Sequence, residues 1–574
     1  MSWWAAIRHF WRVAGGYWWA EHRWLARFLV LALIALTVAQ ISIPVAINLW
    51  ILDLFNALES RAMDRLSFLL IFLLLIVVAN VVIVNLHLRV KRQLQIGWRE
   101  WLTEKITNEW MVAGRPYLLT FVPGAHDNPD GRIAEDVHNA TEYAIDLSHS
   151  LLYDVLLLIS FTRILWSLSE PPYYLIDDVQ IHLPGYLIWI AIVYAAIGTI
   201  CALTLGRFLV RSVDRRQTAE ADFRFGLVHA RENALRIALA KGEANERDNF
   251  RRLFSGVHVA WDGVTAALAR MFYFSSSWSV LSQVFPTLIM APRYMLGLIT
   301  LGALMQTAQA FQQTVAALSW AIDNLGKFAD WRASVERMMG LHDGIVALGH
   351  GREGGIEIVA SNRAALTLHN VSISNAAGDA ELAAVNAEIR PGDHLLVTGE
   401  TGPAANIMKA VAGLWPWGTG RVEIPAGAEI YFMPSRPYMP ADRLRNVLCY
   451  PLPPSARDEA AIVAALRQVG LDHLIDRLEE VAKWDQSLTA DAQQRLGFAR
   501  LLLQRPSWIF LEDATEALDV TGQREMVQLL NREFSHAAIV AIGHRDTLSG
   551  FGTRAVSVVR DAGGLILKDL SPPR

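Results

Sequence analysis

Six long apolar stretches constrain this chain more than any other feature of its sequence. Each is close to the length of about 20 residues that an α-helix needs to cross a bilayer. They cover approximately residues 25–50, 66–88, 144–168, 185–210, 268–290 and 295–318. Hydrophobic residues make up 53% of the 574 positions, which is high for a soluble protein. The N-terminal part, residues 25–335, is therefore expected to be an all-α membrane domain with six spans.

The first 24 residues interleave large aromatic side chains with arginines. The members of this set are Trp3, Trp4, Phe10, Trp11, Trp18 and Trp19 with Arg8, Arg12 and Arg23. Aromatic and basic side chains of this kind favour the boundary between membrane and water. No short apolar core with a small-residue cleavage site is present. Residues 1–24 are thus predicted to form an interfacial helix and not a cleaved signal peptide.

Charges in the connecting loops orient the predicted spans. The loops after spans two and four are long and rich in arginine, whereas the loop after span three carries Glu170, Asp177 and Asp178 with no lysine or arginine. Basic loops remain on the cytoplasmic side. Both termini and the long segments 89–142 and 211–262 are therefore predicted to be cytoplasmic, the segments as helical extensions of the spans.

The composition changes after residues 336–355, which are predicted to be a linker. From 356 to 574, short β-rich runs alternate with helical stretches, as in a soluble α/β domain. The two cysteines, Cys201 and Cys449, exclude a disulfide framework and a cysteine metal site.

One stretch of this second domain has the setting of a phosphate-binding P-loop. A strand-like run ends at Val397, a loop runs from Gly399 to Asn406, and an apolar helical run follows. A working P-loop requires glycine, lysine and serine or threonine at the last three loop positions. Here Gly399 and Gly402 are kept, but those three positions hold Ala404, Ala405 and Asn406. Lys409, one turn further along, is expected to be a surface cation.

Several stretches together resemble the half-transporters of the ABC transporter family, and more closely its SbmA/BacA-like members, which are related to the ABCD fatty-acyl transporters. The matching stretches are 128–136, 317–320, 331–333, 412–418, 436–438 and 493–500. The resemblance covers nearly the whole chain. It implies a six-helix transmembrane domain followed by an α/β P-loop nucleotide-binding domain, with ATP and Mg²⁺ as cofactors. It also implies a second subunit, because each nucleotide site is built across a dimer interface.

The resemblance assigns roles to further positions, and most of them depart from the family pattern. Ser435 stands where a glutamine senses Mg²⁺, and Thr489 and Asp491 lie in the altered signature Leu488–Ala492. The acidic pair Glu512-Asp513 is reversed, with Glu512 in the Mg²⁺ position and Asp513 in that of the general base.

His544 matches the switch histidine of the family. Asp491 would place a negative charge against the γ-phosphate. The altered positions together predict a domain in which ATP turnover is weak or lost, although its fold is kept.

Polar groups within the predicted spans are the remaining candidates. Charged residues in a membrane are costly and are usually functional or paired. Asp154, in span three, is a candidate to bind a proton or substrate, with a hydrogen bond or ion pair between helices as the alternative. Gln306, Gln309 and Gln313 indicate either a water-filled cavity or a packed helix interface.

The sequence therefore predicts a homodimeric transporter in the lipid bilayer of a bacterial inner membrane, with no nucleic-acid partner. The resemblance implies hydrophilic or amphipathic substrates, such as peptides, peptide antibiotics, cobalamin-like molecules or acyl compounds. Proton coupling is expected if ATP is not used. Two alternatives stay open: the degenerate half of a heterodimer with one competent ATP site, and a membrane-anchored scaffold that transports nothing.

Overall fold

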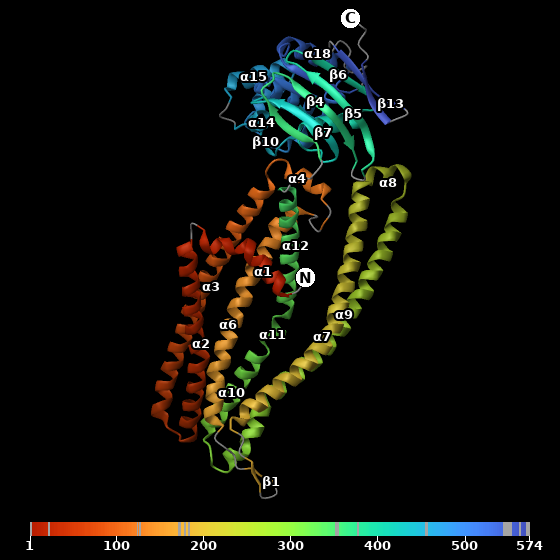
Figure 1. The fold of residues 1–574 in the computed structure, drawn as a ribbon. Coiled ribbons are helices and arrows are strands. Elements are labelled where there is room, and N and C mark those ends of the chain that lie inside the picture. Colours follow the sequence, from red (N-terminus) through yellow and green to blue (C-terminus); the bar gives the residue numbers. More distant parts are fainter. Residues whose placement is uncertain are drawn as a thin grey trace. The chain divides into compact units, whose positions relative to one another are not determined.

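The structure, a computed structural model, divides into two compact units. It describes residues 3–20, 23–122, 124, 128–169, 174–176, 179–181, 184–349, 355–375, 378–453, 457–543, 554–561 and 564–569. Unit 1 comprises Met1–Thr107 and Ala125–His342, and unit 2 comprises Asn108–Gly124 and Asp343–Arg574. Unit 1 is helical, and unit 2 is built on β-sheets with helices packed against them (Figure 1).

Helices, most of them long, make up unit 1. They are α1 (Trp3–Ala14), α2 (Arg23–Glu59), α3 (Met63–Trp110), α6 (Val137–Leu168), α7 (Tyr186–Glu232), α8 (Ala234–Ala240), α9 (Glu243–Met295), α10 (Leu301–Leu318), α11 (Trp320–Asp323) and α12 (Leu325–Gly349). The short elements are η1 (Gly15–Trp19), α5 (Pro129–Gly131), η3 (Arg132–Asp136) and the antiparallel strands β1 (Tyr174–Ile176) and β2 (Val179–Ile181).

Four helices in the described part of the chain are long and apolar enough to cross a membrane. They are α2, α3, the continuous stretch Pro129–Leu168, and α7. The predicted fifth and sixth spans fall in α9 and α10, which are helical but are not among these four. Membrane-spanning helices are thus present, while their number, six, stays a prediction.

The core of unit 1 lies where α6, α7 and α10 meet. Phe161, Leu187 and Phe311, one from each helix, have no exposed surface. Tyr194 on α7 stacks on Trp278 of α9 at 4.2 Å between ring centroids, which joins the fourth long helix to the same core. These contacts form a buried core, while many apolar side chains of the same helices remain exposed on the surface of unit 1.

Some of the N-terminal aromatic side chains are buried in unit 1, and others are exposed. Phe10 and Tyr17 are buried and pack against Trp98 of α3, whose indole N–H donates to the carbonyl of Ala14 at 2.9 Å. In contrast, Trp19 is 75% exposed. Part of the predicted interfacial set is therefore used to anchor α1 and η1 to the bundle.

Helices α7 and α9 form a long hairpin with α8 at its tip. The two helices lie side by side, and near α8 they stand apart from the other helices of unit 1 (Figure 1). Large apolar side chains are exposed there, including Leu235, Leu239 and Val259. This part of the hairpin belongs to the segment 211–262, which is predicted from the sequence to lie outside the membrane.

Unit 2 contains two large sheets. The six-stranded sheet has the order β14 (Gly564–Asp569), β13 (Arg554–Asp561), β6 (His394–Gly399), β12 (Ala538–Ile542), β11 (Trp508–Glu512), β8 (Ile430–Met433). The four-stranded sheet has the order β3 (Glu357–Ser361), β7 (Gly418–Pro425), β4 (Leu366–Ser374), β5 (Ala380–Ile389). A two-stranded pair joins β9 (Asp442–Arg443) to β10 (Val481–Ala482).

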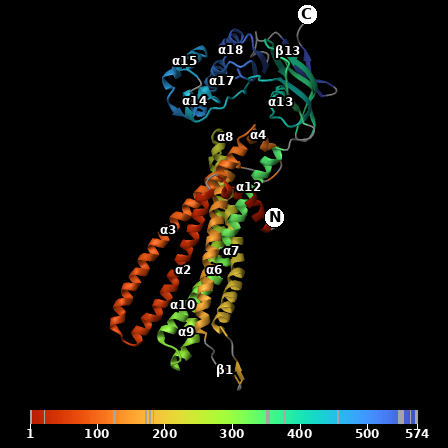
Figure 2. The ribbon, with the colours of Figure 1, turned by 60° about the vertical axis from the view of Figure 1, so that its left-hand side comes forward.

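Unit 2 also contains helices, of which α13 lies beside the strands and α14 and α15 lie to one side of them (Figure 2). They are α4 (Arg115–Leu118), η2 (Leu119–Phe121), α13 (Thr401–Val411), α14 (Leu444–Cys449), α15 (Glu459–Gln468), η5 (Asp472–Arg477), α16 (Trp484–Ser487), α17 (Ala490–Gln504) and α18 (Val520–Glu533).

Strand β11 shows why the larger sheet is buried on both faces. Ile509 and Leu511 belong to the hydrophobic cluster that contains α17 and α18, while Trp508 and Phe510 belong to the cluster that contains α13 and β4. Successive side chains of a strand point to opposite faces, so an uninterrupted apolar run is required here. The neighbours β8 and β12 are parallel to β11, as an α/β domain requires.

The units do not follow the linear boundaries drawn from the sequence. Residues Asn108–Gly124, which lie within the predicted membrane domain 25–335, group with unit 2. The predicted linker 336–355 is helical as far as Gly349, because α12 continues through it. The apolar periodicity of a sequence cannot reveal that a short internal segment packs with a distant domain.

Candidate functional site

The P-loop position is a tight turn between β6 and α13. Strand β6 ends at Gly399 and α13 begins at Thr401, so Glu400 alone connects them. Gly399 has φ +98°, and a Cβ atom there would meet the carbonyl oxygen of Val558 at 2.2 Å. Glycine is therefore required at this position for the close approach of two strands, independently of any nucleotide.

Few backbone amides of this turn are free to receive a phosphate. In an α-helix the amide of each residue bonds to the carbonyl four residues earlier, so amides from Ala405 onward are engaged within α13. Among the first four positions, Pro403 has no N–H. The amide of Ala404 lies four residues after the N-cap Glu400, whose own amide is bonded to the carbonyl of Val558 at 3.4 Å. Thr401 and Gly402 offer the remaining amides of the first turn, whereas a P-loop wraps the phosphates with a longer run of amides.

The Mg²⁺-ligand position is occupied by a side chain that is bonded within the protein. Asn406 is buried, and its amide nitrogen donates to the Glu381 carboxylate on β5 at 2.9 Å. Lys409 donates to the Asn406 side-chain oxygen at 3.1 Å. Lys409, predicted to be a surface cation, is half-buried and lines the cavity beside α13. Its spacing, one turn after Asn406, places both on one face of the helix.

This cavity, of about 480 Å³, is acidic. Among its described lining residues, four carry carboxylates and one carries an ammonium group: Asp379, Glu381, Glu400, Glu512 and Lys409. Burial raises the pKa of Glu512, while Lys409 opposes that rise and Asp513 adds to it. Two like charges 4 Å apart near a protein surface repel by about 4 kcal/mol. The cavity therefore presents predominantly negative charge where the resemblance implies a triphosphate.

The signature positions form the start of α17. The Thr489 hydroxyl accepts a hydrogen bond from the amide of Ala492 at 3.3 Å, which is the arrangement of an N-cap. Asp491 forms a salt bridge with Arg495 at 3.2 Å in the first turn. The helix terminus thus has its own cap and its own anion, two features that a phosphate would otherwise supply.

Gln494 joins several of the predicted positions, although sequence reasoning did not single it out. This residue is 2% exposed, and its side-chain nitrogen donates to the carbonyls of Ser435 at 3.0 Å and Asp513 at 3.2 Å. Its oxygen accepts from the amide of Ala517 at 3.0 Å. One buried amide therefore brings together the loop of Ser435 and the acidic strand end. In the sequence, Gln494 is distinguished only by its place in the stretch 493–500, which resembles the family.

The acidic pair lies at the end of β11 as expected. Glu512 is the last residue of the strand, and Asp513 has φ 44°, a left-handed conformation that few non-glycine residues adopt. The amide of Asp513 donates to the carbonyl of Ile542 at the end of β12. His544 lies outside the described residues.

Residues Asn108–Gly124 pack on unit 2 through aromatic rings. Phe121 makes an edge contact with Trp417 at 4.6 Å between centroids, and Trp415 and Trp417 contact each other at 5.2 Å. Burial and the nearby Glu512 carboxylate raise the pKa of Tyr117. This segment therefore contacts the helix-strand connection that follows α13 and also lies near the acidic cavity.

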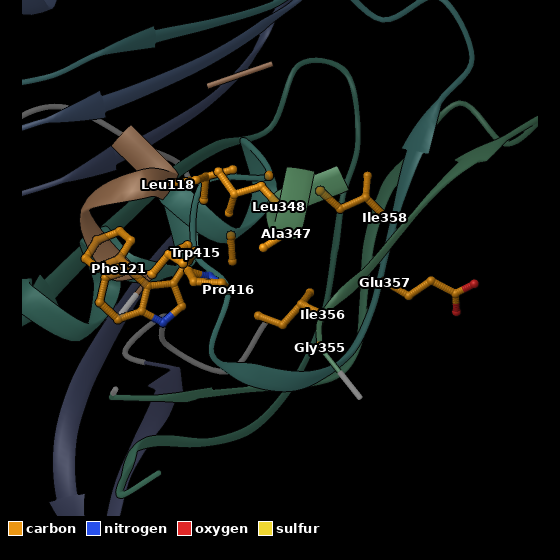
Figure 3. A pocket seen from close by; sticks show the side chains of 13 residues that line it. Leu118, Phe121, Ala347, Leu348, Gly355, Ile356, Glu357, Ile358, Trp415 and Pro416 are labelled. Atoms are coloured by element: carbon orange, nitrogen blue, oxygen red, sulfur yellow. The ribbon is translucent and has the colours of Figure 1, made fainter. Parts of the chain in front are cut away.

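An apolar cavity of about 680 Å³ borders the same segment (Figure 3). Leu118 lines it from α4 and Phe121 from η2, Leu348 lines it from the end of α12, and Trp415 from the region after α13. The Trp415 indole N–H donates to the carbonyl of Ser374 at 3.1 Å, so its polar edge is already paired. All the described residues that line this cavity belong to unit 2.

The polar residues of the predicted spans are partly used for packing. Gln306 is 5% exposed, and the Asn48 side chain on α2 donates to its carbonyl at 3.0 Å and also to the Gln309 side chain. This favours the packed helix interface over the water-filled cavity. Asp154 on α6 interacts electrostatically with Asp323 of α11. Within the described residues, neither of these two carboxylates has a hydrogen bond or ion pair.

Comparisons with known proteins agree on one family. The pattern of the family described as ABC transporter transmembrane region 2 matches residues 18–295. An uncharacterized ABC transporter ATP-binding protein of Synechocystis is 30% identical, with 94% of this chain and 81% of that protein covered. The inner membrane ABC transporter ATP-binding protein YddA of Escherichia coli is 27% identical, with 92% and 93% covered.

A solved structure supports the fold. The structure of a bacterial Atm1-family ABC exporter with ATP bound superimposes with a TM-score of 0.66 at 16% identity, covering 94% of this chain and 95% of that one. A helical membrane domain followed by an α/β nucleotide-binding fold is therefore confirmed. Together with the relative in Synechocystis, these findings show that the chain belongs to the ABC transporter family.

Proposed function

We propose that this protein is a membrane transporter whose nucleotide-binding domain does not turn over ATP at an ordinary rate. The observation that carries the proposal is the cavity beside α13, where four carboxylates surround one ammonium group among the described lining residues. The side chain of Asn406 is bonded to Glu381 and Lys409, and Ala405 provides no cation. These groups do not fit the phosphates of MgATP as the family binds them.

We further propose that a homodimer is the working form. The α7–α9 hairpin exposes Leu235 (73%) and Leu239 (77%) near its tip, outside the predicted membrane segment. Contiguous apolar surface in water usually marks an interface. A second copy of the chain would cover it, and unit 2 would then act as a clamp that holds the two subunits together.

The homodimer is tested by the mass of the detergent-solubilised protein. Leu239→Asp should shift the protein toward the monomer, because it places a charge in the interface. Met63→Asp is the matched control, since Met63 is 78% exposed but lies in a different part of unit 1. A Leu239→Asp protein that stays as dimeric as the control would exclude this interface.

The energy source would be the proton gradient. Asp154 and Asp323 are carboxylates of the membrane domain, and the charge of Asp323 acts on Asp154. A carboxylate in a low dielectric with a like charge near it favours the protonated form, so Asp154 is the candidate to carry the proton. The resemblance to SbmA/BacA-like proteins supports hydrophilic or amphipathic solutes, including peptides, cobalamin-like molecules and acyl compounds, in a bacterial inner membrane.

Titration of the full-length protein with Mg-ATP tests the proposal without a known solute. Calorimetry should show no binding, and hydrolysis measured in the same sample should not exceed the background. Clear turnover would mean that Glu512 and Asp513 suffice without a P-loop lysine. Turnover that appears only when a second ABC subunit co-purifies would instead favour the degenerate half of a heterodimer.

Transport is tested separately in vesicles. Uptake of labelled peptides should follow an imposed pH gradient and be unaffected by ATP depletion. Peptide uptake that depends on ATP and does not change with the pH gradient would exclude proton coupling. Deletion cells with unchanged uptake of every solute class named above, together with retained partner binding, would favour the scaffold.

A further inference from the structure

Two histidines from different helices of unit 1 are in direct contact. The Nε2 atoms of His87 on α3 and His149 on α6 are 2.7 Å apart, with 4.3 Å between ring centroids. His87 is 8% exposed. Since the residues are 62 positions apart in sequence and neither stands in a motif described above, no sequence pattern pointed to them.

A ladder of polar contacts continues from this pair along the same two helices. Lys91 forms a salt bridge with Asp146 at 2.9 Å, and Gln95 donates to the same carboxylate at 2.7 Å. Arg92 pairs with Glu142 at 2.6 Å one step further. From one contact to the next, the residue numbers rise on α3 and fall on α6 by about one helical turn. The two helices are therefore antiparallel here.

The chemistry of imidazole limits the protons that the pair can hold. At 2.7 Å one Nε2 must carry the hydrogen and the other must accept it. The contact is therefore compatible with two neutral rings, or with one neutral and one charged ring. Two charged rings would each carry hydrogen on Nε2, so two donors and two positive charges would face each other. The hydrogen bond between the two Nε2 atoms therefore cannot persist when both rings are protonated.

The charged groups around the two histidines do not compensate for two positive charges on the pair. Among the described residues, the charged groups that interact with the pair are Lys91 on α3 and Asp146 on α6. These two neutralise each other through their salt bridge. On α11, which also packs on α6, Asp323 interacts with Asp154, and Trp320 donates to the Ser150 hydroxyl beside His149.

We propose that His87 and His149 form a proton-binding site at which uptake of the second proton separates α3 from α6. Histidine is the side chain that ordinarily changes charge near neutral pH. The site would add a proton-sensitive contact to the membrane domain at the ends of spans two and three that are predicted to be cytoplasmic. The inference goes beyond the proposed function, because proton binding at this pair can be measured whether or not any solute is transported.

Nitrogen NMR of ¹⁵N-histidine-labelled full-length protein in lipid nanodiscs tests the site directly. At about pH 8 we expect a coupling between two Nε2 atoms across the hydrogen bond, and at about pH 3 its loss with both rings protonated. The coupling should be absent in His87→Gln and His149→Gln, and kept in the control His258→Gln, whose ring is paired only along α9. A coupling that persists at low pH, or none at high pH, overturns the proposal.

A distance measurement shows whether the helices separate. Nitroxide labels at Leu88→Cys and Ser148→Cys, both exposed positions next to the histidines, report the spacing by EPR after Cys201→Ser. The label distance should increase at low pH in the parent and stay constant in His149→Gln, which can bond to His87 but cannot be protonated. An equal increase in His149→Gln would show that other groups drive it. These readouts involve neither ATP nor uptake, so their failure is distinct from failure of the proposed transport.

Discussion

The ammonium group of Lys409 donates a hydrogen bond to the side-chain oxygen of Asn406 at 3.1 Å. Asn406 stands where the family places the hydroxyl that holds Mg²⁺. A cation contributed by the protein itself is therefore bonded to that residue. The pair therefore stabilises the start of α13 through contacts within the chain.

Removal of this cation should destabilise unit 2. In Lys409→Ala the carboxylates of Glu381 and Glu512 lose the one ammonium group among the described lining residues of the cavity. We expect a loss of about 1 kcal/mol in the free energy of unfolding, since Lys409 is partly exposed and its interactions are screened. Thermal unfolding of the full-length protein measures it. Lys483→Ala, at an exposed position, should change the melting temperature little, and an equal loss in both variants would contradict the role of Lys409.

Glu512 should make the stability of unit 2 depend on pH. Burial raises its pKa above the ordinary value of 4.5, so the folded state holds the proton more tightly than the unfolded state. The stability it contributes is fully present below pH 4.5 and is lost as the pH rises through the raised pKa. Glu512→Gln should thus be more stable than the parent at neutral pH, by about 1 kcal/mol or less.

This difference should shrink as the pH falls, which melting curves at several pH values would show. Glu516→Gln is the control, because Glu516 is exposed and lies a few residues away. If the stabilisation of Glu512→Gln over the parent grew as the pH fell, the pKa of Glu512 would not be raised in the folded protein.

Gln494 should be critical for the arrangement of the degenerate site. Gln494→Ala removes the side-chain hydrogen bonds to the carbonyls of Ser435 and Asp513 and to the amide of Ala517. Ser435 and Asp513 are half-buried and Ala517 is exposed, so water can replace part of these bonds, and we expect a loss of about 1–3 kcal/mol in the free energy of unfolding. Gln528→Ala, on the exposed face of α18, should have little effect. Hydrogen exchange should increase at residues 433–437 and 513–517, and protection equal to the parent would disprove the bridging role.

Phe121 should hold the segment Asn108–Gly124 on unit 2. Phe121→Ala removes the edge contacts with Trp415 and Trp417, which contribute about 0.5–1.5 kcal/mol each beyond burial. Limited proteolysis should then cleave within residues 112–122 faster than in the parent. Met111→Ala, at a position that is 63% exposed, is the control. Unchanged cleavage in Phe121→Ala would mean that other contacts hold the segment.

The sequence predicted the architecture because hydrophobic patterns are local. Apolar runs of membrane length define α2, α3, α6 and α7 without knowledge of any contact. The short β-rich runs after residue 356 likewise predicted an α/β domain, and the run Trp508–Leu511 forms strand β11. The weaker runs in α9 and α10 were harder to assign, because their polar residues are tolerated only through contacts such as that of Asn48 with Gln306.

The sequence by itself determined the family, the order of the two large parts and the loss of lysine and glycine at the P-loop. It did so because each of these features is written in adjacent residues. Only the tertiary structure decided what replaced the missing groups and which distant residues meet. Lys409 lines the cavity, Gln494 bridges two loops, and His87 contacts His149, because folding brings together helices and strands that are far apart in the chain. Such contacts depend on packing geometry, which no local pattern records.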